Sequence, residues 1–469
     1  MATKTFFNRY ICSYSTALLL AFLTRIIWIF SIPPISNAPD EVSHWIAIKY
    51  LSEYFRQPSS EEIVGVEVGA HILQVQMSYF HMVITNFSLS KFFTHESILI
   101  YASRIVNALL SIVVVLNCKY FFEKVFKDTW LANILSLVVA FHPQYVFISS
   151  YINNDIFACW ITTLSIIALS EFVVKPASLE PLQQSRFQKL SHLSLFILPL
   201  SIFCSIYAKS SALLIYIAAV IVIAILAIKK VIKYLVQKRD RKPEIFFHIN
   251  KPTIIYRLIL VIAPLVLSYL LYSLYTLKLS LPGISPGDVL SGSFMAQVIV
   301  YPTLPKGIYS TIFSSHSLVS YLIQYTRMGY WQLVIEGFWG IFDNMSMKMN
   351  SLWYYFYLPY LITFFYGAFK VFANSSKHNR FILLDYILCL AIFLTCIGSL
   401  SFSYKVDLQP QGRHFLPVLL VFYYFVVKGL KSIGGYYFTK LAVLLLLLGS
   451  VICTTLYVPL CLFRVYHAN

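Results

Sequence analysis

The fold is decided by the first apolar run and by the polar cluster that follows it. Residues 14–33 are YSTALLLAFLTRIIWIFSIP, and residues 34–45 continue as PISNAPDEVSHW. A helix needs about 20 predominantly apolar residues to cross the hydrocarbon core of a bilayer. The first run has that length, so we predict a membrane-spanning helix that ends just before two adjacent acids, Asp40 and Glu41.

The composition extends this interpretation to the whole chain. Of 469 residues, 59% are apolar and only 12% are charged, whereas a soluble domain has about 25% charged residues. So few charges cannot cover the surface of a soluble protein of this length. The eight cysteines lie in or beside apolar runs, where they are typically small buried hydrophobes. We therefore predict an all-α polytopic membrane protein that forms a single integral membrane domain over 1–469.

About 11 runs are apolar enough to be transmembrane helices, with a range of about 10–13 because two of them are short. The N-terminus is predicted to be cytoplasmic. Two long extracytoplasmic loops (34–97 and 277–351) contain amphipathic stretches that predict interfacial helices, and 229–253 is a basic cytoplasmic loop. The predicted spans lie near 14–33, 98–118, 130–150, 156–174, 192–208, 210–228, 254–276, 352–372, 381–401, 414–428 and 440–461.

The net charge of +17 follows from this topology. With the N-terminus inside, most Lys and Arg residues fall on cytoplasmic segments, while the outer segments are nearly neutral, as the positive-inside rule predicts. A nucleic-acid partner is therefore not needed to explain the basic balance. The polar clusters that could carry chemistry lie on the extracytoplasmic side.

The first cluster contains Asp40, Glu41 and His44 in the stretch NAPDEVSHW. On a helix the two acids share a face with the histidine. Acids also favour a helix N-terminus, so the alternative is a purely structural role at the start of a helix. The functional interpretation is a general base, or a metal ligand, held at the membrane surface.

Two further clusters lie at the outer ends of predicted spans. The stretch YINND at 151–155 contains Asn154 and Asp155, which either cap a helix or add polar groups at the level of Asp40. The stretch QPQGRHFLP at 409–417 contains Arg413 and His414. Its arginine either snorkels to the interface or binds a phosphate oxyanion, and Gly412 could let a headgroup approach the backbone.

Two other features complete the candidates. Trp339 lies in the stretch EGFWGIFD at 336–343, where it is either part of an interfacial aromatic belt or a stacking floor for a sugar ring. Arg104 lies about two turns inside its span, and an intramembrane charge is by default a functional candidate. It lies towards the outer face, where it could contact a lipid phosphate.

The order of these motifs resembles the GT-C superfamily of membrane glycosyltransferases, which includes protein O-mannosyltransferases and the aminoarabinose transferases of lipid A. The closer likeness is to a bacterial multipass family with PPDExxH, ND, FWG and QGRYxxP segments. The corresponding segments are PDEVSH at 39–44, NNDIFA at 153–158, FWG at 338–340 and QGRHFLP at 411–417. Two departures are His414 where the family has Tyr, and the absence of Pro-Pro after His71.

This resemblance implies an inverting hexosyl- or pentosyltransferase. The donor is a sugar on a polyprenyl-phosphate carrier, and the acceptor is a hydroxyl on a glycan, lipid or protein of the cell envelope. The implied location is the inner (cytoplasmic) membrane, with the active site outside. Asp40 is the first choice for the base and Glu41 the second. Arg413 and Arg104 are implied to bind the phosphate, while His44, Asn154, Asp155, His414 and Trp339 are implied to bind substrate.

No cofactor is required by these motifs, although a divalent metal held by Asp40 and Asp155 stays open. Three other classes compete with the transferase. A flippase or transporter of lipid-linked glycans typically has internal repeats and midplane charges, and the sequence contains no such repeat. A glycan polymerase or ligase differs only in motif order, and a scaffold would not need polar clusters at one membrane level.

Overall fold

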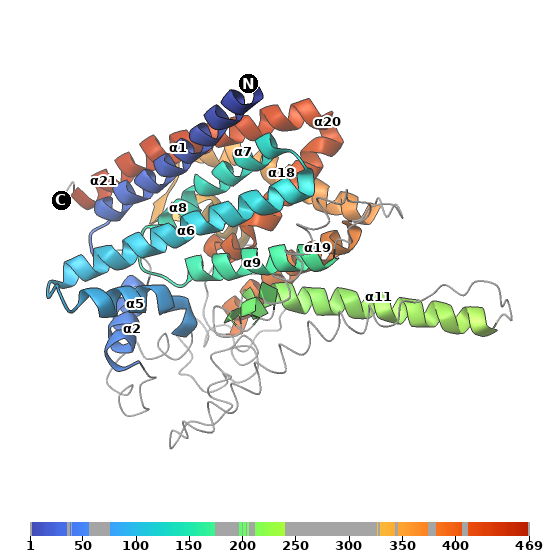
Figure 1. Ribbon diagram of the computed structural model, residues 1–469, viewed down its shortest axis with the longest axis horizontal. Helices are drawn as coiled ribbons and strands as arrows, with labels where there is room; N and C mark the ends of the chain where they lie inside the picture. Colours follow the sequence, from blue (N-terminus) through green and yellow to red (C-terminus); the bar gives the residue numbers. More distant parts are fainter. Residues whose placement is uncertain are drawn as a thin grey trace, which may run out of the picture.

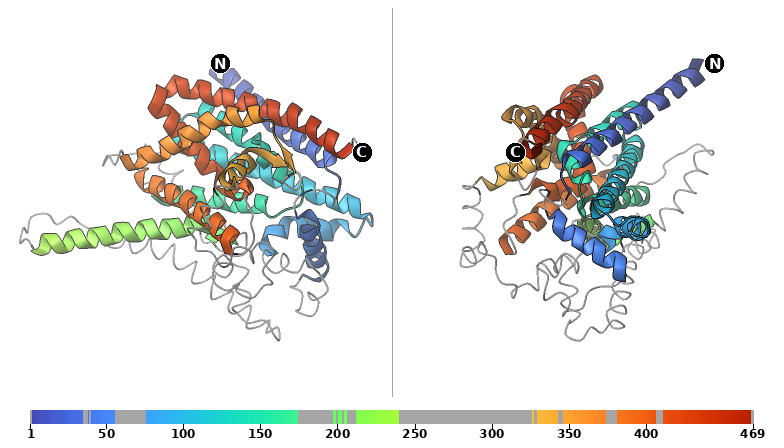
Figure 2. Two further views of the ribbon diagram at one scale, coloured as in Figure 1. Left: turned by 180° about the vertical axis from the view of Figure 1, so that it is seen from behind. Right: turned by 90° about the vertical axis from the view of Figure 1, so that its left-hand side faces the viewer.

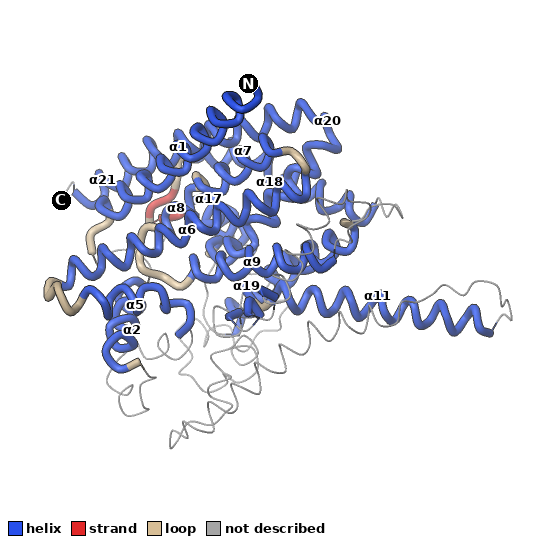
Figure 3. The backbone as a smooth tube through the Cα atoms, in the orientation of Figure 1, coloured by secondary structure: helices blue, strands red, loops and turns tan. Residues whose placement is uncertain are grey.

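The computed structural model is almost entirely helical (Figures 1 and 3). It describes residues 2–34, 38, 40–55, 76–173, 197–198, 200–202, 204–205, 212–239, 326, 329–342, 346–373, 381–405 and 411–467. Within these ranges the only strands are β1 (Ile341–Phe342) and β2 (Met347–Lys348), which form an antiparallel pair. The predicted helical class is therefore confirmed.

The helices follow one another along nearly all of the described chain. They are α1 (Ala2–Ser31), α2 (Glu41–Tyr54), η1 (Gln76–Tyr79), α5 (Phe80–Leu89), α6 (Glu96–Phe126), α7 (Thr129–Ala140), α8 (Pro143–Ser149), α9 (Asp155–Val173), α11 (Leu214–Arg239), α17 (Tyr330–Gly340), α18 (Ser351–Ala373), α19 (Ile382–Lys405), η3 (Gly412–Val418), α20 (Leu419–Ile452), η4 (Cys453–Tyr457) and α21 (Val458–His467).

Five helical stretches among the described residues are long and apolar enough to cross a bilayer, and the bent pair α7–α8 makes a sixth. The five are Ser13–Ser31, Glu96–Phe126, Ser351–Ala373, Ile382–Ser401 and Gly412–Phe463. The first four coincide with runs predicted near 14–33, 98–118, 352–372 and 381–401. The fifth contains the two runs predicted near 414–428 and 440–461.

The other predicted spans are less completely described. The run near 156–174 is helix α9, and the run near 210–228 corresponds to a shorter apolar helix, Leu214–Leu226. The run near 254–276 and most of the run near 192–208 lie outside the described residues. The number of about 11 spans therefore stays a prediction.

The run predicted near 130–150 is broken in its middle. Helices α7 and α8 meet at an angle of 60°. Pro143 is the first residue of α8, and His142 before it has the extended values φ −65° and ψ 121°. Proline lacks the backbone N–H and disfavours helical geometry in the preceding residue, so it explains the break. Arg25 Nη2 donates to Ala140 O at 2.9 Å, satisfying a carbonyl that the break leaves open.

A second interruption lies at Gly435 inside α20. Its φ of 73° and ψ of −162° are not helical, so α20 consists of two helices joined at this residue. Glycine reaches this backbone geometry without a Cβ clash, which other residues cannot do. The two runs predicted near 414–428 and 440–461 therefore correspond to the two parts of α20 and the residues beside them.

The helices pack into a bundle with a smaller cluster at one end (Figures 1 and 2). Helices α2 and α5 contact each other, and α5 packs against α6. The C-terminal helix α21 packs beside α1, so the chain ends near the C-terminal end of α1 and far from its N-terminus (Figure 1). The cluster of α2 and α5 comes from the first predicted outer loop, 34–97.

Candidate functional site

The two adjacent acids at the start of α2 point in different directions. Asp40 is the residue before the helix and has φ 61° and ψ 9°, in the left-handed region. Aspartate tolerates this region better than most residues with a Cβ. The Asp40 side chain is 44% exposed, whereas Glu41 is 1% exposed. One sharp turn therefore gives two neighbouring carboxylates opposite environments.

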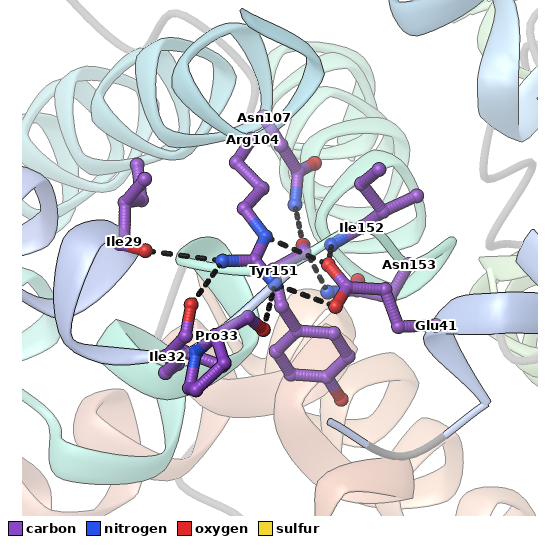
Figure 4. Close-up of polar contacts among 9 residues, drawn as sticks. All are labelled: Ile29, Ile32, Pro33, Glu41, Arg104, Asn107, Tyr151, Ile152 and Asn153. Atoms are coloured by element: carbon purple, nitrogen blue, oxygen red, sulfur yellow. Dashed lines mark hydrogen bonds and ion pairs between the residues drawn. The ribbon is translucent and has the colours of Figure 1, made fainter. Parts of the chain in front are cut away.

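Glu41 forms a buried ion pair with Arg104 of α6 (Figure 4). The guanidinium donates from Nε to Oε1 at 2.8 Å and from Nη2 to Oε2 at 2.6 Å. Glu41 Oε1 also accepts the backbone N–H of Ile152 at 2.9 Å. This carboxylate therefore joins α2, α6 and the turn between α8 and α9.

Arg104 also closes the C-terminal end of α1. It donates from Nη1 to Ile29 O at 3.0 Å and to Ile32 O at 2.6 Å, and from Nη2 to Pro33 O at 3.0 Å. With the two bonds to Glu41, all five N–H groups of the guanidinium have protein acceptors. Its side chain is 0% exposed.

The contacts of Glu41 and Arg104 do not favour the roles predicted for them, which stay predictions. Arg104 was expected to bind a lipid phosphate, but its donors are filled by the protein and no part of it is exposed. Glu41 was the second choice for the base, but it is held in a buried ion pair. Both residues fix the backbone around Asp40, and neither is accessible to a substrate in this conformation.

The turn between α8 and α9 is built by two asparagine side chains. Asn107 Nδ2 donates to Tyr151 O at 2.9 Å, and Asn153 Nδ2 donates to the same oxygen at 3.0 Å. Asn153 Oδ1 accepts the backbone N–H of Asp155 at 2.9 Å, at the first residue of α9. The capping role predicted for the YINND stretch is therefore present, and it is carried by Asn153. Asp155 itself is 1% exposed and Asn154 is 8% exposed.

Arg413 of η3 reaches from the other end of the chain to Asp40. Nη2 of Arg413 donates to Asp40 Oδ2 at 2.9 Å, across 373 positions of sequence. Nη1 donates to Tyr151 Oη at 3.1 Å and Nε donates to Gln411 Oε1 at 2.5 Å. The Tyr151 ring points away from the Arg104 network (Figure 4), so its hydroxyl is turned towards Arg413. The guanidinium is 9% exposed and its carboxylate partner 44%.

The charges of Asp40 and Asp155 raise the pKa of two buried tyrosines next to these groups, Tyr79 and Tyr151. Burial raises the pKa of Tyr79 well above its usual value, and the charges of Asp155 and Asp40 raise that pKa further. Burial and Asp155 also raise the pKa of Tyr151, while Arg413 lowers it. These couplings show that Asp40, Asp155 and Arg413 share one electrostatic environment. His44 is also buried there, with Nδ1 at 2.5 Å from Tyr79 Oη.

The QGRHFLP segment packs directly on the FWG segment. A Cβ on Gly412 would lie 1.9 Å from Phe338 N and 2.2 Å from Val334 O of α17. The expectation that Gly412 leaves room for a headgroup is therefore wrong, because that space holds the backbone of α17. The absence of a side chain at this position instead allows η3 and α17 to touch. His414 follows in η3 and is half-buried.

Trp339 lies in the aromatic core and not on a surface. It is 1% exposed. Its ring stacks on that of Tyr357, with a centroid distance of 4.2 Å and an interplanar angle of 7°. It also stacks on the ring of His142, with a centroid distance of 5.2 Å and an angle of 21°. The expectation of an exposed belt residue or sugar floor is corrected, because no face of the ring is open.

Four residues with contacts in this region are not among the sequence-based candidates. Tyr79 has no motif around it, and Tyr151 and Gln411 are inside the recognised segments but were given no role. Asn107 lies three residues after Arg104 on the same helix, a spacing that indicates a shared face. Among the described residues, no three His, Cys, Asp or Glu side chains are grouped as metal ligands. A divalent metal on Asp40 and Asp155 stays a prediction.

Comparison with known proteins gives a family and a fold. The family model described as dolichyl-phosphate-mannose-protein mannosyltransferase matches residues 15–280. No curated protein sequence matches the chain. A similar solved structure is the oligosaccharyltransferase AglB from Archaeoglobus fulgidus, in complex with an inhibitory peptide and a dolichol-phosphate, with 12% identity and a TM-score of 0.51. The match covers 97% of this chain and 56% of that one.

A second structure of the Archaeoglobus fulgidus oligosaccharyltransferase, in the apo form, has 14% identity and a TM-score of 0.49, and covers 96% of this chain and 56% of that one. The chain thus spans a little over half the length of these structures. At such low identity the similarity concerns the fold alone.

Proposed function

The chain belongs to the dolichyl-phosphate-mannose-protein mannosyltransferase family, and from this premise we propose that it transfers a sugar from a polyprenyl-phosphate carrier to a hydroxyl acceptor. The resemblance to GT-C membrane glycosyltransferases is confirmed by the family match and by the similarity to the AglB fold. The protein is a multi-pass membrane glycosyltransferase, in agreement with its apolar helices.

The observation that carries the proposal is the contact between Asp40 and Arg413. A half-exposed carboxylate and a nearly buried guanidinium meet at 2.9 Å, although 373 positions separate them. Sugar transfer from a phosphate carrier needs one group to accept a proton and another to hold the leaving phosphate. These two residue types in contact supply both functions in one place.

We assign the base to Asp40 because it is the accessible acid of the pair. Its carboxylate takes the proton of the acceptor hydroxyl, and the oxygen attacks the anomeric carbon of the donor sugar. The bond from that carbon to the phosphate oxygen breaks, and the polyprenyl phosphate leaves with the electron pair. A single displacement of this kind inverts the anomeric configuration, and Asp40 then releases its proton to water.

Arg413 is assigned to the phosphate of the donor. Guanidinium offers two parallel N–H groups that match two phosphate oxygens. Its Nη2 contacts Asp40 in the unliganded chain, so an incoming phosphate competes with the carboxylate for this donor. Binding of donor then loosens Asp40 from its cation and makes it a stronger base. His44, Asn154, Asp155 and His414 are proposed to orient donor and acceptor around these two groups.

The proposed location is the extracytoplasmic face of the inner membrane. The positive-inside rule assigns the basic loop 229–253 to the cytoplasm and the loop with Asp40 to the other side. Nucleotide sugars are cytoplasmic, so a site on the outer face depends on a lipid-linked donor. The acceptor class is a hydroxyl of a cell-envelope glycan, lipid or protein. A divalent metal on Asp40 and Asp155 would be an addition to this scheme that the mechanism does not require.

The test is transfer by the purified full-length protein in proteoliposomes. Radiolabelled polyprenyl-phosphate hexoses and pentoses are supplied with membrane extract as acceptor, and the product is analysed by mass spectrometry and anomeric NMR. We expect label to move to acceptor with inverted configuration. Movement of intact carrier between leaflets without any transfer would indicate a flippase, and growth of a glycan chain on the carrier would indicate a polymerase.

A further inference from the structure

Tyr79 is a fully buried tyrosine that none of the sequence motifs contains. It is the last residue of η1 and is 0% exposed. Its ring packs in a small apolar cluster with Trp45, Ile48 and Ile100. Its hydroxyl has a different environment, because it lies 2.5 Å from His44 Nδ1, and the two rings are 5.6 Å apart.

Burial raises the pKa of Tyr79, the charges of Asp155 and then Asp40 raise it further, and Asn154 lowers it. The phenol therefore keeps its proton at neutral pH. A protonated phenol can both donate and accept a hydrogen bond, so it can pair with either neutral tautomer of His44.

His44 is also joined through its backbone to Asp40, the half-exposed acid. The backbone N–H of His44 donates to Asp40 O at 3.0 Å. His44 lies in α2, whereas Tyr79 belongs to η1, 35 positions further along the chain. The Tyr79 hydroxyl therefore connects η1 to the helix that follows Asp40.

We propose that Tyr79 is a positioning residue of the transfer site, whose hydroxyl holds His44 in place beside Asp40. This rests on the proposed function, and it adds a residue to that site. The ring of Tyr79 packs in the apolar cluster, whereas its hydroxyl contacts His44. Substitution by phenylalanine separates the two, because it keeps the ring and removes only the oxygen.

The first test compares Tyr79→Phe with a control of the same kind. Tyr360→Phe removes another largely buried tyrosine hydroxyl, one that donates to Ala442 O at 2.9 Å in a contact between α18 and α20. We expect Tyr79→Phe to lower kcat about tenfold and to change KM less than threefold. The reason is that a misplaced polar group slows the reaction more than it weakens substrate binding. Tyr360→Phe is expected to keep kcat. Equal kcat for Tyr79→Phe and wild type would overturn the proposal.

The second test is a double-mutant cycle with His44→Gln. If Tyr79 acts through His44, its hydroxyl has nothing to hold once the imidazole is gone, so the double variant is expected to be no slower than His44→Gln alone. Independent, multiplying losses would assign Tyr79 a purely structural role. Should Tyr79→Phe fail to accumulate, His44→Asn replaces it, because its amide keeps a hydrogen-bonding atom near the position of Nδ1. We expect His44→Asn to retain more activity than His44→Gln, and equal activity would overturn the proposal.

The same cycle is also measured by thermal unfolding, which needs no substrate. We expect the double variant to melt no lower than the less stable single variant, because both changes break one contact. Additive losses in melting temperature would contradict a Tyr79–His44 contact. Absence of transfer by the wild-type protein would reject the proposed function, and the melting cycle would still decide whether Tyr79 holds His44.

Discussion

Glu41 and Arg104 form an ion pair at 2.6 Å in which both side chains are almost completely buried, at 1% and 0% exposure. The neighbouring acid, Asp40, pairs with Arg413 while remaining 44% exposed. Two consecutive acids thus meet two different arginines, one pair fully buried and the other with a half-exposed carboxylate. The pair Glu41–Arg104 fixes the backbone around Asp40, and we propose that the pair Asp40–Arg413 carries the chemistry.

Glu41→Gln is expected to destabilise the protein strongly. The substitution leaves the Arg104 cation buried without its counter-charge, and breaking a buried pair in this way costs about 3–5 kcal/mol. The measurement is the melting temperature and yield of the purified variant. Glu96→Gln is the matched control, because Glu96 pairs with Lys49 at a half-exposed site, where a salt bridge contributes about 0–1 kcal/mol. Equal stability of the two variants would contradict this account.

Arg413→Lys is expected to fold and to lose activity. Lysine keeps the positive charge but has no planar fork to hold two phosphate oxygens, and it cannot reach Asp40, Tyr151 and Gln411 together. We expect kcat/KM for the lipid-linked donor to fall about 10²-fold or more, in the range found when one oxyanion donor is removed. Lys49→Arg serves as a control at an exposed position. Unchanged kcat/KM in Arg413→Lys would contradict the proposal that Arg413 binds the phosphate of the donor.

Gly412→Ala is expected to disturb the packing of η3 on α17. The added Cβ would lie 1.9 Å from Phe338 N, and backbone atoms cannot move aside as a side chain can. We expect a lower melting temperature and lower activity, since Arg413 follows in the chain. Gly434→Ala is the comparison, because its Cβ would meet only the exposed side chain of Phe438. A larger loss of stability in Gly434→Ala would argue against this packing.

Because of His81, we expect the stability of the protein to fall as the pH is lowered below about 6.5. Burial lowers the pKa of His81 to about 4, against an ordinary value of 6.5, and a hydrogen bond with Asn107 raises it only partly. In the unfolded chain the imidazole takes up a proton near its ordinary pKa. Its contribution to stability is therefore fully present above about pH 6.5 and is lost as the pH falls towards 4, by at most about 3 kcal/mol.

The measurement for His81 is melting temperature against pH for wild type and His81→Gln. We expect the variant to have a flatter profile between pH 6.5 and pH 4. Identical slopes in the two proteins would show that His81 does not contribute to the acid limb. The site acids are the same in both proteins, so their own titration cancels in the comparison.

The membrane class and the helical fold could be predicted from the sequence because apolar runs of sufficient length have few alternatives. The break in the run near 130–150 was not predicted, although Pro143 indicates it, because apolar composition continues through the proline. The two parts of α20 were predicted as separate runs because polar residues and glycines interrupt the apolar pattern around Gly435.

The residues of the candidate site could be named from the sequence, but the contacts between them could not be predicted. Asp40, Asp155 and Arg413 are candidates because each follows or opens an apolar run and belongs to a motif. The partner of each charge depends on contacts between distant segments, which periodicity does not contain. Arg104 therefore looked like a phosphate ligand, and only its five protein acceptors reveal its structural role. No sequence motif contains Tyr79, so the sequence alone does not indicate a role for it.

We propose Asp40 as the base of a sugar transfer from a polyprenyl-phosphate donor. The most direct measurement is kcat of Asp40→Asn in proteoliposomes, at equal protein amount and with donor affinity measured in parallel. General base catalysis contributes about 10²–10⁴-fold, so we predict a fall in kcat of that size in a variant that accumulates and binds donor. A kcat within a few fold of the wild type would contradict the claim.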